Sequence, residues 1–248
     1  GVRSDSDMHT LGFSFHPWTE HQTIAGGSQI LGYLRDTARE HAIDRNIRFG
    51  HKVLRADWSS EEAAWTVETQ RAQDENATRV RCGFLFMCSG YYDYAGGHRP
   101  DFPGEASFRG RIVHPQHWPT DLDYAGKRVV VIGSGATAVT LVPALADKAA
   151  HVTMLQRSPT WMVARPSIDT IDAGLRRHLP LRLALGLARW KNVLLSQLMV
   201  AFCKHSPQRM RKLLLGGVRR ALGPNADIDM HFTPRYNPWE QRLCLVPG

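Results

Sequence analysis

The stretch VVVIGSGATA at residues 129–138 places a glycine-rich turn between a β-branched run and a helix-forming run. A second apolar run, HVTMLQ at residues 151–156, follows after about one helix length. Strand, tight turn, helix and second strand in this order are typical of a βαβ unit, whose two strands run parallel. The sequence therefore predicts an α/β fold of the Rossmann type around residues 127–156.

The turn itself has the spacing of a dinucleotide-binding GxGxxA motif. Gly133 permits the tight turn, Gly135 lets a pyrophosphate approach the backbone, and Ala138 keeps helix and sheet close together. Free backbone amides at the positive end of the helix face the phosphates. The predicted cofactor-binding residues of the turn are Gly133, Ser134, Gly135, Ala136, Thr137 and Ala138. The alternative is a glycine-rich βαβ turn that binds no ligand.

The end of the second predicted strand distinguishes between dinucleotides. An NAD or FAD site usually carries Asp or Glu there, which binds the ribose 2′-hydroxyl. This chain instead has Gln156, Arg157 and Ser158, which removes the negative charge and supplies a guanidinium for a 2′-phosphate. We therefore expect NADP, with a plain surface arginine as the alternative.

The formal net charge of +8 and the pI near 9.6 favour anionic partners, namely nucleic acid, a membrane surface or a phosphorylated cofactor. Many basic residues fall in helical segments such as RMRKLLLGGVRR, so we favour a solvated face over a nucleic-acid patch. The four cysteines show neither CxxC nor zinc spacing, which favours a reducing, cytoplasmic location and predicts no metal site.

The longest apolar stretch, LPLRLALGLARWKNVLLSQLMVAF, is interrupted by Arg182, Arg189 and Lys191. These charges argue against a simple membrane span of about 20 apolar residues. We favour a buried or interfacial helix and keep membrane contact as the alternative. No signal peptide is visible, and both ends of the sequence look cut from the middle of a longer chain.

Periodicity predicts the remaining elements. Ser28 is a candidate N-cap for a helix, and three β-rich runs follow it. The third run contains FLFMC at residues 84–88 and is expected to form a strand buried on both faces. A Gly-, Pro- and Tyr-rich linker marks a boundary near residues 90–104, and residues 167–222 are expected to be mostly helical.

The stretch FRGRIVHPQHWP carries Phe108, Gly110, His114 and Trp118. These positions match FxGxxxHxxx(W/P), the fingerprint of Baeyer–Villiger monooxygenases. The chain resembles flavin-containing monooxygenases with two dinucleotide-binding domains, and the Baeyer–Villiger branch most closely, over nearly its whole length. In that family the fingerprint lies where the flavin and NADP domains meet, so the resemblance implies that His114 tunes domain orientation and does not abstract a proton. A satisfied loop histidine is the alternative.

Other segments carry the same resemblance. MCSGYYDY is similar to the strand that leaves the flavin domain, with Cys88, Ser89 and Gly90 at its small-residue hinge. GVRSDSD resembles the family's G-x-R-x-D and assigns Asp5 a position near flavin and nicotinamide. EQRLCL resembles the segment that returns to the flavin domain, and it assigns Arg242 the stabilisation of the peroxyflavin. Ordinary surface ion pairs or caps are the alternatives for these two residues.

The resemblance implies a Rossmann-like flavoprotein fold of which this chain is an internal part. The expected organisation is a partial FAD-binding domain at 1–90, a linker with the fingerprint at 91–126, an NADP-binding domain with a helical insertion at 127–235, and the start of the return to the FAD domain at 236–248. This sequence does not include the family's GxGxxG for FAD, so the chain alone is expected to be inactive.

The implied activity uses FAD and NADPH. NADPH reduces the flavin, the reduced flavin captures O2 as a C4a-peroxide, and one oxygen atom enters an organic substrate, expected to be a ketone that becomes an ester or lactone. An N- or S-oxygenating flavin monooxygenase and a non-catalytic NADP-binding module are the alternatives. A disulfide reductase would need a redox CxxC, which this chain lacks. No nucleic-acid partner is expected, and the oligomeric state is open.

Overall fold

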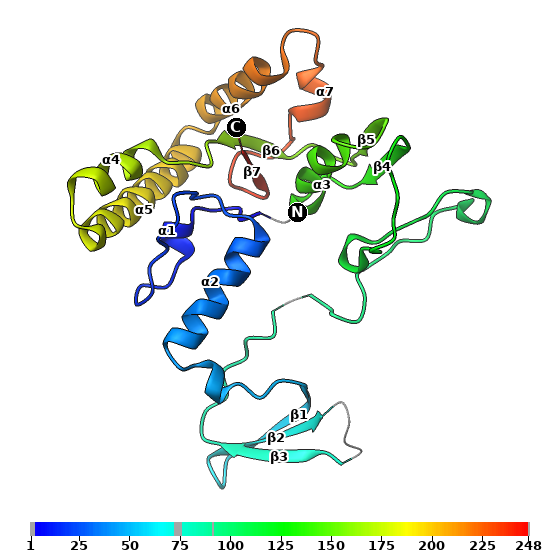
Figure 1. The fold of residues 1–248 in the computed structure, drawn as a ribbon. Coiled ribbons are helices and arrows are strands. Elements are labelled where there is room, and N and C mark those ends of the chain that lie inside the picture. Colours follow the sequence, from blue (N-terminus) through cyan, green and yellow to red (C-terminus); the bar gives the residue numbers. More distant parts are fainter. Residues whose placement is uncertain (1–2, 72–75, 91, 248) are drawn as a thin grey trace. The chain divides into compact units, whose positions relative to one another are not determined.

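The computed structural model describes residues 3–71, 76–90 and 92–247 (Figure 1). The chain divides into two compact units. The first unit comprises residues 1–37 and 120–248, and the second comprises residues 38–119. Helix α2 (Gly27–Glu40) crosses the first boundary between them.

The predicted βαβ motif is present in the first unit. It consists of β4 (Arg128–Ile132), α3 (Ala136–Ala146) and β5 (His151–Leu155). The two strands are parallel, and the Gly133 amide extends their pairing by donating to the Leu155 carbonyl at 2.8 Å. The turn residues follow directly on the end of β4, so they lie immediately before the start of α3. This part of the fold prediction is confirmed.

A second parallel pair joins distant parts of the same unit. Strand β6 (Trp161–Arg165) pairs with β7 (Leu243–Pro247), so Trp161 lies opposite Leu243. The sequence interpretation missed β6, although WMVAR is rich in aromatic and apolar residues. Trp161 is 1% exposed and forms a core with Cys203, Met210 and Leu214. This core attaches the helical segment to the β6–β7 pair.

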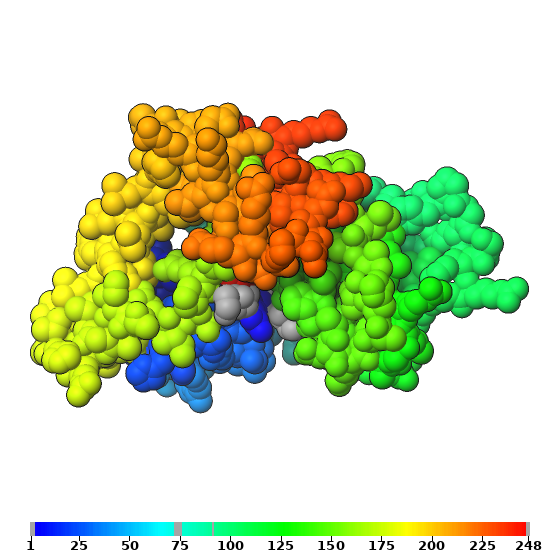
Figure 2. Space-filling view, turned by 90° about the horizontal axis from the view of Figure 1, so that it is seen from above, coloured from blue at the N-terminus to red at the C-terminus, as the bar shows by residue number. Residues whose placement is uncertain are grey.

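The segment after β6 is helical, as predicted. It contains α4 (Thr170–His178), α5 (Leu181–His205), α6 (Pro207–Leu222) and the short α7 (Ile228–Phe232). The side chain of Asp169 caps α4 by accepting from the amides of Ile171 and Asp172 at 3.0 and 3.2 Å, which satisfies donors that the first turn leaves free. Figure 2 shows α6, in orange, beside α7, in deeper orange, and the two helices contact each other.

The N-terminal part of the first unit packs against this helical segment. Helix α1 (Met8–Leu11) is short, and Met8 and Trp18 form a small core with Ala25. The Thr23 amide donates to the Ser167 carbonyl at 2.8 Å. The predicted N-cap at Ser28 is wrong, because α2 already begins at Gly27 and the Gln29 side chain accepts from the amide of Gly26.

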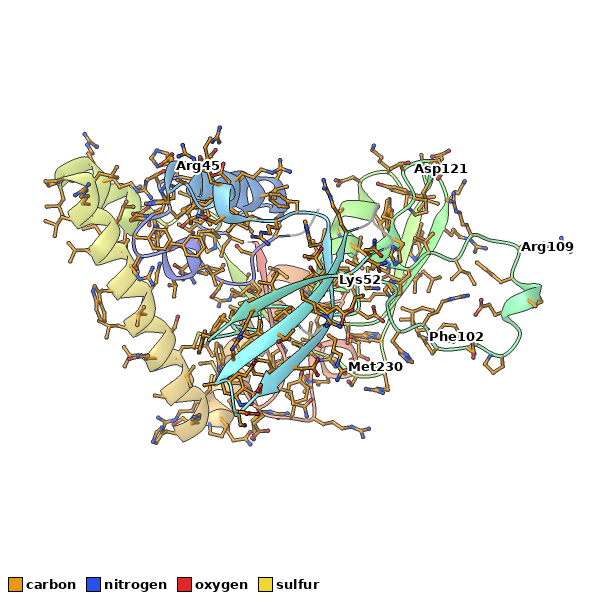
Figure 3. The ribbon with its side chains drawn as sticks, turned by 90° about the horizontal axis from the view of Figure 1, so that it is seen from below. Arg45, Lys52, Phe102, Arg109, Asp121 and Met230 are labelled. Carbon is orange, nitrogen blue, oxygen red and sulfur yellow. The ribbon has the colours of Figure 1, made fainter. Side chains whose placement is uncertain are left out.

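The second unit contains a three-stranded antiparallel meander. Its strands are β1 (His51–Ser59), β2 (Ala64–Arg71) and β3 (Thr78–Cys82), in the order β1-β2-β3. Trp58 and Trp65 face each other across the first pair with ring centroids 5.4 Å apart. Figure 3 shows the strands side by side, with Lys52 on β1, and it shows Arg109 pointing outward from a later loop of the same unit. Strands are thus confirmed for the three predicted β-rich runs, the third only as far as Cys82.

The expected buried strand at residues 84–88 is wrong. Strand β3 ends at Cys82, and residues 83–90 have no regular structure. Phe84 and Phe86 are 77% and 76% exposed. An apolar strand stays buried only when neighbouring strands and covering layers exclude water from it, and no strand within the described ranges pairs with this run.

Candidate functional site

The turn between β4 and α3 has the backbone geometry that a phosphate site needs. Gly133 has a φ of +129°, a conformation that side-chain-bearing residues rarely adopt. Gly135 is the N-cap of α3 and makes no side-chain cap, and the first hydrogen bond of the helix runs from Val139 to its carbonyl at 3.0 Å. The amides of Ala136 and Thr137 precede that bond, so the helix itself does not satisfy them. They could bind a phosphate at the positive end of α3.

Ser134 stabilises the turn from the inside. Its hydroxyl donates to the Ser158 carbonyl at 2.9 Å, and the buried Thr160 hydroxyl donates to the Ser134 carbonyl at 3.0 Å. These bonds tie the turn to the segment after β5. The predicted site residues Ser134 and Ser158 are thus brought together, and the Ser134 side chain is occupied within the protein. Ala138, also predicted, is 5% exposed and lets α3 approach the strands.

Gln156 and Arg157 follow β5 but have different surroundings. The Gln156 side-chain amide donates to the His231 carbonyl at 2.7 Å, so it anchors the end of α7. Arg157 is exposed, and among the described residues its guanidinium forms no ion pair. Arg157 is therefore free to bind an anionic group next to the turn, whereas Gln156 already has a structural partner.

Arg242 lies beside the same turn. Its Nη1 atom is 3.8 Å from the position that a Cβ atom on Gly135 would occupy. The Tyr236 hydroxyl donates to the Arg242 carbonyl at 3.0 Å and fixes the backbone just before β7. A guanidinium thus adjoins the glycine-rich turn, although more than 100 residues separate the two in sequence.

Asp5 and Arg242 both influence the thiol of Cys244. Burial raises the pKa of the Cys244 thiol in β7, the Arg242 charge opposes that rise, and the Asp5 carboxylate adds to it. Both charges therefore lie close enough to act on one buried atom. The structure thus brings two parts of the predicted site together, the turn and Arg242.

A buried polar contact between Asp7, two residues after Asp5, and Asn192 was not found from the sequence. The Asp7 and Asn192 side chains are 2% and 1% exposed, and the Asn192 amide donates to Asp7 Oδ1 at 2.9 Å. Arg165 donates to Asn192 Oδ1 at 3.2 Å and lies 3.9 Å from Asp7 Oδ2. In the structure Asp7 caps α1 by accepting from the Thr10 amide, and an aspartate before a helix could have suggested that role. No local pattern pairs it with a residue in the middle of α5.

A second buried pair lies nearby. His9 Nε2 is 3.3 Å from Asp172 Oδ2, and Arg176 Nε donates to the same carboxylate oxygen at 2.8 Å. Arg189 donates to the carbonyls of His9 and Gly12 at 3.0 and 2.9 Å. Charged and polar contacts with α4 and α5 therefore fix the position of the segment that follows Asp5.

The fingerprint residues lie in the second unit and have a direct steric explanation. The Phe108 ring folds over Gly110, and a Cβ atom on Gly110 would lie 2.5 Å from Phe108 Cζ. The His114 ring lies against Gly97, where any Cβ atom would overlap it. His114 Nδ1 accepts from the Gln116 amide at 3.3 Å and caps the turn at Pro115–His117. With Phe108 in this position, residue 110 has no room for a side chain.

Trp118 is 40% exposed. The four fingerprint residues belong to the second unit, and the glycine-rich turn belongs to the first. Within the part of the chain that the structure describes, no three His, Cys, Asp or Glu side chains group as metal ligands. No helix in those ranges is long and apolar enough to cross a membrane.

The chain matches a known family and known proteins in sequence. The family model described as flavin-binding monooxygenase-like matches residues 3–203. The chain is 56% identical over 249 residues to the FAD-containing monooxygenase EthA of Mycobacterium tuberculosis, an alignment that covers 100% of this chain and 50% of that protein. The chain thus spans about half the length of the curated relatives that it matches.

Solved structures of similar fold include two NADP-bound monooxygenases. An oxidized steroid monooxygenase matches with a TM-score of 0.59 and 30% identity over 71% of this chain and 34% of its own. Cyclohexanone monooxygenase from Rhodococcus sp. Phi1 matches with a TM-score of 0.55 and 29% identity over 71% of this chain and 34% of its own. These findings confirm the predicted α/β fold class and the resemblance to flavin-containing monooxygenases.

Proposed function

Because this chain belongs to the flavin-binding monooxygenase-like family, we propose that it is the central part of an FAD- and NADPH-dependent monooxygenase that inserts one oxygen atom of O2 into an organic substrate. The observation that carries this proposal is the glycine-rich turn at the start of α3 with Arg242 beside it. The related protein named as FAD-containing and the neighbours solved with NADP support the choice of cofactors.

The residues present fit a bound dinucleotide. Gly133 provides the backbone conformation, and the amides at the start of α3 would hold the pyrophosphate. Arg157, which is exposed and free of ion pairs among the described residues, would bind the 2′-phosphate of NADPH. Gln156 and Ser134 would act indirectly, because their side chains hold the surrounding backbone.

Bound FAD would accept the hydride from NADPH and supply the chemistry of oxygen transfer. Arg242 would stabilise the negative charge that develops on oxygen during this transfer, by the same physics as an oxyanion hole. Asp5, whose charge acts on the same buried thiol, would orient Arg242 and the nicotinamide amide. Neither residue acts as a nucleophile in this proposal.

The fingerprint favours Baeyer–Villiger chemistry, in which a ketone becomes an ester or lactone. The Phe108 ring lies against Gly110 and the His114 ring against Gly97, so closely that a Cβ atom at either glycine would overlap the ring. One neighbour of similar fold is named for a ketone, cyclohexanone. The division into a partial FAD domain at 1–90, a linker at 91–126, an NADP domain at 127–235 and a return segment from 236 is part of this proposal, as is a cytoplasmic location.

Product analysis tests the proposal. The complete polypeptide that carries this chain is loaded with FAD and given NADPH, 18O2 and either a ketone or a thioether. We expect one 18O atom in an ester or lactone from the ketone. A sulfoxide as the sole labelled product would assign the alternative, N- or S-oxygenation. NADPH binding without flavin reduction or labelled product would assign a non-catalytic NADP-binding module.

His114 is proposed as a positioning residue in this reaction. His114→Ala should keep NADPH binding, because the turn at Gly133 is built from backbone amides, but should lower the product formed per NADPH and raise hydrogen peroxide release. His117→Ala, in the same short turn, is the matched control and should leave this ratio unchanged. A proton-transfer role would instead cost about 10²–10⁴-fold in the step that His114 serves, with a shifted pH profile.

A further inference from the structure

The positive charge of this chain is concentrated in one segment. Residues 173–226 contain 11 of the 31 Lys and Arg residues and neither Asp nor Glu. The rest of the chain therefore holds 20 basic and 23 acidic residues. The excess of positive charge comes from the segment that forms the end of α4, all of α5 and all of α6.

Helix α5 exposes a continuous apolar face. We define the outer stripe as five side chains that are 43% to 66% exposed: Leu183, Leu187, Trp190, Leu194 and Leu198. Their spacing of three or four residues places them on one side of the helix. Another side of α5 is buried and carries Ala184, Leu185, Ala188, Asn192 and Cys203. Both sides of α5 therefore carry apolar residues, and the larger apolar side chains lie on the side that faces solvent.

The same segment carries exposed basic residues. Some cations of the segment are used internally, such as Lys191, which pairs with Asp169, and Arg176, which pairs with Asp172. Others are exposed, and these are Arg177, Arg182, Lys204, Arg209, Lys212 and Arg220. Helices α5 and α6, yellow and orange in Figure 2, contact each other and both reach the surface seen there.

We propose that α5 and α6 bind the surface of an anionic membrane. Large apolar side chains, with a tryptophan among them, can enter the boundary between lipid headgroups and acyl chains, while Lys and Arg bind lipid phosphates. Each basic residue near an anionic bilayer adds attraction, and the absence of acidic residues removes the opposing repulsion. The helix lies on the bilayer and does not cross it, in keeping with the charges at Arg182 and Lys191.

The two features together favour lipid over other occupants. A nucleic acid would use the cations but leaves five large apolar side chains of the outer stripe in water, where exposed apolar patches are unfavourable. A second copy of the chain would bring a like charge to the same surface and be repelled. A lipid surface can bury the apolar side chains of the outer stripe and bind the basic residues through its phosphates at the same time. The inference does not depend on the proposed oxygenation.

Vesicle flotation tests this inference with the complete polypeptide. Vesicles of phosphatidylcholine alone and of phosphatidylcholine with phosphatidylglycerol in equal amounts serve as probes. We expect binding to the mixed vesicles that weakens as salt rises. Trp190→Glu should lower the partition coefficient about tenfold or more, because it places a carboxylate in the lipid boundary. Arg209→Ala should lower it about fivefold.

Met230→Glu is the matched control, because Met230 is 69% exposed on α7 and Trp190 is 66% exposed on α5. The control should bind vesicles as the unchanged protein does, and both variants should oxidise NADPH in solution at the unchanged rate. Quenching of tryptophan fluorescence by brominated lipids gives a second measurement on the unchanged protein, which does not require a variant to fold.

Several results would overturn the inference. Equal partition of Trp190→Glu and Met230→Glu would show that the outer stripe does not meet the lipid. A lower melting temperature or an altered oligomer size for Trp190→Glu without vesicles would show that protein covers this face, either from the rest of the polypeptide or from a second copy. Binding to DNA or RNA but not to anionic vesicles would assign the cations to nucleic acid.

Discussion

The buried contact between Asn192 and Asp7 should contribute strongly to the stability of the first unit. The Asn192 side chain is 1% exposed, donates to Asp7 Oδ1 at 2.9 Å and accepts from Arg165 at 3.2 Å. Asn192→Ala would leave the Asp7 carboxylate, itself 2% exposed, without its side-chain amide donor. It would also leave a small cavity between α5 and the N-terminal segment.

The magnitude follows from these two losses. A hydrogen bond to a charged group contributes about 1.5–3 kcal/mol, and a buried group left without its partner adds a desolvation cost. Removing the partner of a buried charge costs about 3–5 kcal/mol in total when no water can replace it. Because the Thr10 amide and hydroxyl still donate to Asp7 at 3.0 and 2.9 Å, and Arg165 lies 3.9 Å away, the loss should fall below that range, at about 2 kcal/mol.

Urea unfolding of the complete polypeptide, followed by circular dichroism, measures this loss. Asn225→Ala is the control, because Asn225 is exposed in the loop before α7, and it should change the free energy of unfolding by less than about 0.5 kcal/mol. A loss below 1 kcal/mol for Asn192→Ala would refute the argument, because water or the Arg165 guanidinium would then satisfy Asp7 as well as the amide does.

Three further predictions concern other parts of the chain. Arg157→Ala should raise KM for NADPH relative to NADH by about tenfold or more, since a charge-assisted contact contributes about 1.5–3 kcal/mol; an unchanged ratio in steady-state kinetics would disprove the 2′-phosphate assignment. Gly97→Ala should destabilise the protein by about 1–3 kcal/mol through overlap with the His114 ring. Gly96→Ala is the control, because a Cβ atom there meets no atom within 4 Å, and it should leave the stability unchanged. Equal melting temperatures of the two variants would contradict the prediction. Burial raises the pKa of Asp169, but the hydrogen bond from Lys191 and those from backbone amides outweigh it and lower the pKa.

The sign of the Asp169 effect follows from that lowered pKa. The folded state binds a proton at Asp169 less readily than the unfolded state, so the stability contribution is present above the ordinary carboxyl pKa near 3.8 and is lost as pH falls through the folded pKa. Asp169→Asn should therefore lower stability at pH 7 and flatten its dependence on pH below about 4. Urea unfolding from pH 3 to 7 measures both, and parallel curves for the two proteins would contradict the assignment.

The βαβ unit could be predicted because its signals are local. The β-branched run, the glycines and the helix-forming run lie within 20 residues, and each constrains the backbone by itself. Strand β6 could not be found in this way, since its partner β7 begins 82 residues after Trp161. Periodicity alone gives no information about a parallel partner so far along the chain.

The site shows the same contrast. The turn and Arg157 were predicted from spacing and charge, and the structure adds that Gln156 is already bound to the backbone near α7. The Asp7–Asn192 contact joins residues 185 apart, and no sequence motif records it. The failed strand at residues 84–88 shows the opposite error, because an apolar run is a sign of burial only where partners exist to bury it.

The pairing of β6 with β7 has a consequence for how the chain is made. A ribosome adds roughly 5–20 residues per second, so the β6 segment waits several seconds after its own synthesis before Leu243 emerges. Once α6 has emerged, the Trp161 face can pack against it but still lacks its strand partner. Contacts at such long separation slow folding, and the open edge of β6 is then a place where a nascent chain could pair with the wrong strand. Chaperone binding during translation would therefore matter most between the emergence of residues 165 and 243.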